Sequence, residues 1–259
     1  MAVVERLHQV RQRIIEAARR GKRNPDKITL IAVTKNATLA QIQELIQAGH
    51  RHFGESRVQH LQLRVQEIDK WLDENQGGRL PTKAEIHWHM IGHLQRNKAA
   101  QVLSIVNLIH SVDSLRLSEQ LNELMARREH PARILMEVNT TGEGSKFGIP
   151  LPAAVHLAEQ IETMAHLQFS GLMTMARLSD HPEEIRESFI RLRELFEEIQ
   201  QRRIVGPHFE HLSMGMSNDF EIAIEEGATM VRVGTAIFGE AEVNLSEEPC
   251  GHSQELDAH

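Results

Sequence analysis

The sequence contains no tyrosine and only one cysteine, Cys250, among its 259 residues. One thiol cannot form an intramolecular disulfide or a cysteine-based metal cage, which is typical of proteins from a reducing cytoplasm. No apolar run approaches the roughly 20 residues needed to span a bilayer, and the charges spread over residues 1–20 argue against a signal peptide. The net charge of −7 argues against a nucleic-acid-binding surface. We therefore expect a cytoplasmic protein that binds neither membranes nor nucleic acids.

Strand-like and helix-like segments alternate along the chain. Eight short segments rich in apolar and β-branched residues have the composition of buried parallel strands. They are residues 28–35, 51–55, 86–92, 106–112, 133–139, 167–173, 209–213 and 229–233. Segments whose apolar residues recur every three or four positions are predicted to be amphipathic helices. They cover residues 3–20, 38–48, 58–72, a short stretch from 97, 117–124, 154–164, 185–199 and 219–226.

Strict alternation of strands and helices predicts a parallel sheet, because parallel neighbours need a crossover helix. Eight such units in about 240 residues predict a single (β/α)8 TIM barrel, with a doubly wound open sheet as the alternative. We expect the barrel to occupy residues 1–240, with an added N-terminal helix over about residues 3–20. Residues 73–84 and 140–150 are predicted to be loops, and residues 241–259 a polar tail that frays.

The first predicted strand ends on a charged residue, Lys35. Lysine is rarely buried without a partner, so its place at the end of an apolar strand calls for an explanation. A barrel carries its functional residues at the C-terminal ends of its strands. Ser56, Asn139 and Met173 follow or end the second, fifth and sixth predicted strands. We expect these residues to share one rim with Lys35.

Two glycine-containing turns follow the last two predicted strands. The first is Ser213-Met-Gly-Met-Ser217 and the second begins at Gly234-Thr235. Glycine lets a backbone approach an anion, hydroxyl groups donate hydrogen bonds to it, and a helix N-terminus offers free N–H groups. Barrels often bind phosphate after strands seven and eight. The turns therefore predict a phosphate cradle rather than two ordinary turns; the candidate residues are Ser213, Gly215, Met216, Ser217, Gly234 and Thr235.

A lysine and a phosphate site at one barrel mouth predict Schiff-base chemistry, either with a phosphosugar or with pyridoxal phosphate. Arg232, at the end of the eighth predicted strand, is either a surface cation or a ligand-binding group. Arginine only donates hydrogen bonds. If it faces the pyridine nitrogen of a cofactor, that nitrogen must be an unprotonated acceptor.

Two pairs of alternating histidines lie on neighbouring predicted strands. His87 and His89 should point to one face of strand three, and His50 and His52 to one face around strand two. With no carboxylate fixed in the pattern, packing and hydrogen bonding are favoured over a metal site. Met173, Met175, Met214 and Met216 are either core or cofactor-lining residues.

These clusters, in this order, resemble the pyridoxal phosphate homeostasis proteins, the YggS/PROSC family of PLP-binding proteins. The resemblance runs from about residue 28 to residue 239. The matching motifs are Ala32-Val-Thr-Lys35, Phe53-Gly-Glu55, His89-Met-Ile-Gly92, Leu94-Gln95, Asn97-Lys98, Ser145-Lys146, Gly148-Ile149, Gly171-Leu-Met173, Leu212-Ser-Met-Gly-Met-Ser217 with Asp219, and Met230-Val-Arg-Val-Gly-Thr-Ala-Ile-Phe-Gly239. Ser56 departs from the family, which often has asparagine there, and this difference changes the side chain next to the predicted cofactor.

The resemblance implies a fold-type III barrel like the N-terminal domain of alanine racemase, without that enzyme's C-terminal β domain. It implies pyridoxal 5'-phosphate (PLP) held as a Schiff base on Lys35, with phosphate at the residues of the two turns and Arg232 beside the pyridine nitrogen. Ser56, Asn139 and Met173 complete the predicted cofactor-binding set. Family members take part in vitamin B6 homeostasis and have no established enzymatic activity.

Three functions remain to be weighed: a PLP carrier or regulator, a racemase-like PLP enzyme, and a phosphosugar Schiff-base lyase. Racemases of this fold use a tyrosine from a second domain as the second base, and this sequence has no tyrosine. His89 is the remaining candidate, and Cys250 in the tail is a poor one. Glu55 and Glu137 leave the lyase open. We expect a carrier, a monomer that dimerises weakly at most, with PLP-dependent apo-enzymes as candidate partners.

Overall fold

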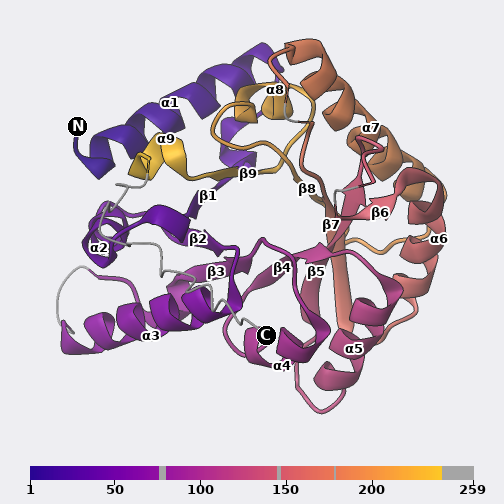
Figure 1. Ribbon diagram of the computed structural model, residues 1–259, viewed down its shortest axis with the longest axis horizontal. Coiled ribbons are helices and arrows are strands. Elements are labelled where there is room, and N and C mark those ends of the chain that lie inside the picture. The colour runs from indigo at the N-terminus through magenta and orange to yellow at the C-terminus, as the bar shows by residue number, and fades with distance from the viewer. Residues whose placement is uncertain (76–79, 145–146, 178, 241–259) are drawn as a thin grey trace, which may run out of the picture.

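The computed structural model describes residues 1–75, 80–144, 147–177 and 179–240. Figure 1 shows its helices arranged in a ring around the strands. In the described chain the barrel strands are β1 (Thr29–Val33), β2 (His52–Glu55), β3 (His87–Met90), β4 (Leu108–Val112), β5 (Ala132–Asn139), β7 (Leu167–Met173), β8 (His211–Ser213) and β9 (Met230–Val233). They are parallel in the order β4-β3-β2-β1-β9-β8-β7-β5, and pairing of β4 with β5 closes the barrel. The predicted (β/α)8 barrel is confirmed.

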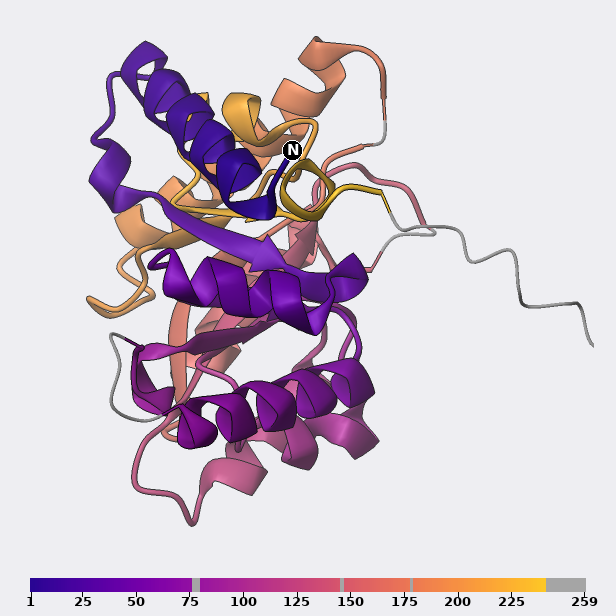
Figure 2. The same cartoon turned by 90° about the vertical axis from the view of Figure 1, so that its left-hand side faces the viewer.

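Apart from α9, the helices match the predicted amphipathic segments within a few residues. They are α1 (Val3–Arg20), α2 (Leu39–Gln47), α3 (Val58–Glu74), α4 (Ala99–Val102), α5 (Leu115–Met125), α6 (Leu151–Glu162), α7 (Pro182–Gln201), α8 (Phe220–Glu225) and α9 (Thr235–Phe238). In α1, a stripe from Val3 through Leu7, Val10 and Ile14 is buried, as the spacing requires. This added helix packs against α8 and α9 (Figure 2).

The core has two layers because alternate residues of a strand point to opposite faces of the sheet. A large apolar cluster fills the space between strands and helices. A separate, smaller cluster lies inside the barrel: Ile31, Leu108, Leu135, Met173 and Met230. Buried polar residues at other interior positions of these strands, such as Arg232 and Glu137, contribute to the candidate site.

Several element boundaries differ from the prediction. β1 ends at Val33, and Lys35 lies in a 3-10 turn, Thr34–Asn36, rather than on the strand. The predicted loop after β5 contains a two-residue strand, β6 (Ile149–Pro150), which pairs with β5. The short helix α9 was not predicted. Residues 145–146 and the predicted tail, residues 241–259 with Cys250, lie outside the described residues, so the domain boundary at residue 240 stays a prediction.

Candidate functional site at the C-terminal mouth of the barrel

Lys35 lies at the C-terminal mouth, in the turn that links β1 to α2. Its side chain is exposed, while the preceding Thr34 is fully buried. The Thr34 hydroxyl donates to Glu55 Oε1 at 2.6 Å, which fixes the turn to the end of β2. Within the described residues the Lys35 ammonium group makes no hydrogen bond or ion pair. An amine that is anchored through its backbone and free at its tip suits attachment of a carbonyl ligand.

The turn after β8 and the start of α9 meet beside β1, since β1 pairs with β9 and β9 with β8. The backbone N–H groups of Gly234 and Ala236 both donate to the Ser217 hydroxyl, each at 3.3 Å. Gly215 has a φ of +91°, and a Cβ at this position would lie 2.6 Å from the Cβ of Ala223, so the turn requires glycine. Converging N–H and O–H donors are the groups that bind phosphate oxygens.

Arg232 points into the barrel from β9 and is almost fully buried. Its Nη1 donates to the Ser213 hydroxyl at 2.7 Å and its Nη2 to the carbonyl oxygen of Thr174 at 2.9 Å. The other guanidinium donors have no partner among the described residues. Burial lowers the pKa of Arg232 to about 10, although Asp219 and Glu137 oppose this shift. It therefore stays a cation with unused donors at neutral pH.

Ser213, predicted to contact phosphate, is fully buried and bonds to Arg232 and to His110. His110 was missed by the sequence prediction, although it lies on β4 at a position that faces the barrel interior. His89 Nδ1 lies 2.9 Å from His110 Nε2, and His52 Nδ1 lies 3.1 Å from His89 Nε2. The structure thus connects the arginine to three histidines inside the barrel.

The two predicted histidine pairs behave differently. His87 and His89 both face the interior near His52, whose ring stacks on that of His87 at a centroid distance of 4.6 Å. His50 lies before β2, where its ring contacts Phe53 edge to face. His50 and His52 therefore do not share a face, because only His52 belongs to the strand. Within the described residues no group of three or more histidine, cysteine or acidic side chains could hold a metal ion.

The two carboxylates considered for catalysis lie on different sides of the sheet. Glu55 is held by Thr34 and is in the layer between the strands and the helices. Glu137 follows Leu135 on the interior face of β5 and is 4% exposed. Burial and, secondarily, the charge of Asp113 raise the pKa of Glu137 to about 7, and Arg232 opposes them. At neutral pH, Glu137 is therefore an interior carboxyl group that holds or releases a proton readily.

The raised pKa of Glu137 gives a testable dependence of stability on pH. Because the folded state binds this proton more tightly than the unfolded chain, Glu137 reduces the free energy of unfolding as pH rises from about 4.5 to about 7. In Glu137→Gln, the free energy of unfolding should fall by up to about 3 kcal/mol less than in wild type over this pH range. Urea unfolding at pH 5, 6, 7 and 8 measures the difference from wild type, with exposed Glu44→Gln as the control. Parallel curves for wild type and Glu137→Gln would contradict the raised pKa.

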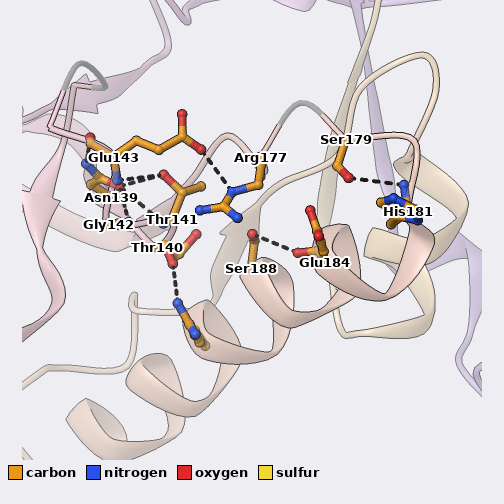
Figure 3. A network of polar contacts seen from close by, with 11 residues as sticks. Asn139, Thr140, Thr141, Gly142, Glu143, Arg177, Ser179, His181, Glu184 and Ser188 are labelled. Carbon is orange, nitrogen blue, oxygen red and sulfur yellow. Dashed lines mark hydrogen bonds and ion pairs between the residues drawn. The ribbon is translucent and has the colours of Figure 1, made fainter.

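The remaining predicted site residues lie on the same side of the barrel but in different surroundings. Met173 is buried inside the barrel, Met216 is exposed, and Ser56 is half-buried at the end of β2. Asn139 Oδ1 accepts from the backbone N–H groups of Thr141 and Gly142, both at 3.1 Å. These bonds hold its own loop (Figure 3). A cofactor contact of Ser56, Asn139 or Met173 stays a prediction.

The loop after β5 is hydrogen-bonded both to α7 and to the segment that precedes it. Arg177 Nε donates to Glu143 Oε1 at 3.1 Å, and Arg191 Nη1 donates to the carbonyl oxygen of Thr140 at 3.1 Å (Figure 3). Thr140 and Thr174 join the ends of β5 and β7 through their hydroxyl groups at 3.1 Å. The same Thr174 offers its carbonyl oxygen to Arg232. This loop network therefore supports the backbone that positions the arginine.

None of the helices in the described ranges is long and apolar enough to cross a membrane.

Comparison with known proteins shows the family to which the chain belongs. Residues 6–242 match the family model described as alanine racemase, N-terminal domain. The pyridoxal phosphate homeostasis protein of Aquifex aeolicus (strain VF5) is 37% identical over 240 residues, which cover 93% of this chain and 99% of the relative. The protein of the same name from Escherichia coli (strain K12) is 36% identical over 237 residues, covering 92% and 96%.

A solved structure shows the same architecture. PipY of Synechococcus elongatus PCC7942, determined with PLP bound, is 32% identical and superposes with a TM-score of 0.76, covering 92% of this chain and all of PipY. The described residues of the present chain form the barrel and its covering helices, with no second β-rich domain among them.

Proposed function

Because the chain belongs to the family of pyridoxal phosphate homeostasis proteins, built on the alanine racemase N-terminal domain, we propose that it binds PLP and serves PLP homeostasis in the cytoplasm as a carrier or regulator without catalysis. The observation that carries the proposal is the pairing of two cations at one mouth. Lys35 is exposed and free at its tip, and Arg232 is buried with donors left over. The Lys35 amine can react with a carbonyl group, and the Arg232 guanidinium can donate a hydrogen bond to a neutral ring nitrogen.

The donor set fits the three functional parts of PLP. Lys35 would hold the aldehyde carbon as a Schiff base, and Arg232 would donate to the pyridine nitrogen. The Ser217 hydroxyl, which accepts from the N–H groups of Gly234 and Ala236, would donate its own proton to the phosphate. PLP supplies an electron-withdrawing ring to amines bound at its carbonyl carbon. A donor-only arginine keeps the ring nitrogen unprotonated and so makes the ring a weaker electron sink, which favours storage over turnover.

The structure gives two arguments for a carrier. His89, the candidate second base, has both ring nitrogens engaged with His52 and His110 inside the barrel. Glu55, one of the two carboxylates considered for a lyase, is buried and accepts from the Thr34 hydroxyl. Glu137, the other carboxylate, is buried inside the barrel and is the acid that an enzymatic reaction would use. The enzymatic alternative is therefore tested directly. Incubation with single amino-acid enantiomers in deuterium oxide should give no racemisation or α-proton exchange at enzymatic rates, and rapid exchange would overturn the carrier proposal.

Titration with PLP tests the proposed binding and the attachment residue. The wild-type protein should gain visible absorbance, and borohydride should fix one cofactor to the peptide that contains Lys35. Lys35→Ala should lose the fixed adduct and bind PLP at least about tenfold more weakly. The matched control is Lys27→Ala, an exposed lysine at the opposite end of β1. A protein that gains no colour with PLP would contradict PLP binding, and an adduct that persists in Lys35→Ala would place the attachment elsewhere.

The proposal extends to partners and assembly. PLP-dependent apo-enzymes are the proposed recipients, and the working form is proposed to be a monomer that dimerises weakly at most. Sedimentation of the protein with and without PLP would test the assembly state, and a stable dimer at micromolar concentration would contradict it.

A further inference from the structure

A continuous series of hydrogen bonds runs through the barrel interior, crosses from β8 to β4, and then follows the wall through β3 to β2. It joins Arg232 on β9 to Ser213 on β8 at 2.7 Å, and Ser213 to His110 on β4 at 2.8 Å. It continues from His110 to His89 on β3 at 2.9 Å and ends at His52 on β2 at 3.1 Å. Five of the barrel strands each contribute one residue. We refer to these five residues as the interior chain.

The chemistry of the first residue sets the direction of every bond in the interior chain. Arg232 can only donate, so the Ser213 oxygen accepts from it. Ser213 is fully buried, and among the described residues the acceptor within reach of its O–H is His110 Nδ1. A buried hydroxyl hydrogen left unpaired would be costly, so Ser213 donates to His110.

The same reasoning fixes the tautomers of the histidines. His110 accepts at Nδ1, so as a neutral ring it carries its proton on Nε2 and donates to His89 Nδ1. His89 then carries its proton on Nε2 and donates to His52 Nδ1. Burial, the main cause, keeps the pKa of His89 and of His110 well below the usual histidine value. The interior chain is therefore neutral beyond Arg232, and in each of its bonds the donor is the residue nearer to Arg232 along the chain.

A neutral chain orients the guanidinium without neutralising it. Ser213 and the Thr174 carbonyl oxygen together fix the plane of Arg232 through two of its nitrogens. No carboxylate is hydrogen-bonded to the guanidinium among the described residues, so its charge remains available to a ligand at the mouth. His110 is needed for this arrangement because it gives the Ser213 hydroxyl an acceptor and thereby leaves the Ser213 oxygen free to accept from Arg232.

We propose that His110 is a positioning residue of the cofactor site: through Ser213 it fixes the guanidinium of Arg232 in the orientation that donates to the ring nitrogen of PLP. This inference rests on the proposed function, because it names the ring nitrogen as the acceptor. The directed interior chain itself belongs to the cofactor-free protein. The two parts can therefore be tested separately.

The direction of the bonds is tested without cofactor. Two-bond ¹H–¹⁵N correlation spectra of histidine-labelled protein at pH 8 distinguish Nε2–H from Nδ1–H tautomers, and His110→Asn and His89→Asn assign the signals. His110 and His89 should both be neutral Nε2–H tautomers. An Nδ1–H tautomer at His110 would reverse its bond to Ser213 and overturn the inference, whether or not the protein binds PLP.

The positioning role is tested by a double-mutant cycle on PLP affinity. His110→Leu and Ser213→Ala should each weaken binding about tenfold and shift the absorbance maximum of the bound cofactor. The double variant should lose no more than either single variant, because both changes break one connection. Additive losses, or an unchanged spectrum in His110→Leu, would overturn the proposal.

Two further variants separate positioning from packing. His110→Asn keeps an oxygen acceptor for Ser213 and should recover most of the affinity and the wild-type spectrum; a loss equal to that of His110→Leu would contradict the acceptor role. Leu108→Val changes an interior apolar residue of the same strand and should lower stability without changing the spectrum. If His110→Leu fails to fold, Ser213→Ala still tests the positioning role, and the tautomer measurement still tests the direction of the bonds. If wild-type protein fails to bind PLP, the proposed function fails while the tautomer result stands.

Discussion

Gly171→Ala should destabilise the protein by more than about 3 kcal/mol, beyond the usual range for a single substitution. Gly171 lies on β7 with a φ of +146°, a conformation that side chains rarely adopt. A Cβ there would be 1.9 Å from the carbonyl oxygen of His211, its paired residue on β8. Neither atom can move without breaking the β7–β8 pairing, because both belong to backbone in the closed barrel.

Urea unfolding at pH 7.5 measures this loss, and Gly144→Ala is the matched control. Gly144 is an exposed loop residue, and a Cβ there would meet nothing within 4 Å. Its substitution should change the free energy of unfolding by about 0.5 kcal/mol at most. Gly171→Ala should also lose PLP binding, because β8 carries Ser213 and β7 leads to Thr174. A Gly171→Ala protein as stable as Gly144→Ala would show that the two strands are not paired as described.

The barrel could be predicted because the pattern of an apolar strand followed by an amphipathic helix is repeated along the chain. Each apolar strand followed by an amphipathic helix requires a crossover, and eight such units can close on themselves. Strand ends are less visible in sequence because a β-strand and the first turn after it share apolar and β-branched residues. Thr34 continues the β-branched composition of β1, yet it begins a 3-10 turn that includes Lys35 and is held by the bond from Thr34 to Glu55. β6 has two residues, too few for any periodicity.

The rim of the site could be predicted, but the partners of its residues could not. Position at a strand end was enough to place Lys35 and Ser217 on one side of the barrel. The contacts of Ser213 depend on which residues face it across the interior, and that depends on how β4 and β8 are placed when the barrel closes. His110 has no neighbour in sequence that marks it, and its role emerges only when β3, β4 and β8 are assembled. The one available signal was that His89 and His110 both occupy interior positions of adjacent strands.

Acid should unfold this protein in a pH range set by its buried histidines. Burial, the largest cause, lowers the pKa of His50 to about 3 and that of His52 to about 4. His89 and His110 are shifted in the same direction. A base whose pKa is lower in the folded state gives its full contribution to stability above the unfolded value of about 6.5, and this contribution is lost as pH falls. For the buried His50, protonation lowers the free energy of unfolding by about 1.4 kcal/mol per pH unit between its unfolded and folded pKa values.

The contribution of His50 to the pH dependence can be measured separately, because His50 lies outside the barrel interior. Its Nε2–H donates to the His52 carbonyl oxygen at 2.8 Å, and Arg11 approaches its Nδ1 at 3.5 Å. His50→Gln keeps a donor and an acceptor but cannot gain a proton. Between pH 6 and pH 4 its free energy of unfolding should therefore fall less steeply than that of wild type, by about 1.4 kcal/mol per pH unit. Glu137 acts with the opposite sign in this range, but it is present in both proteins and cancels from the comparison.

Urea unfolding at half-unit pH steps measures both slopes, with His8→Gln on the exposed face of α1 as the control. Equal slopes for wild type and His50→Gln would mean that His50 is charged in the folded protein, which the close approach of Arg11 and its burial against Phe53 argue against.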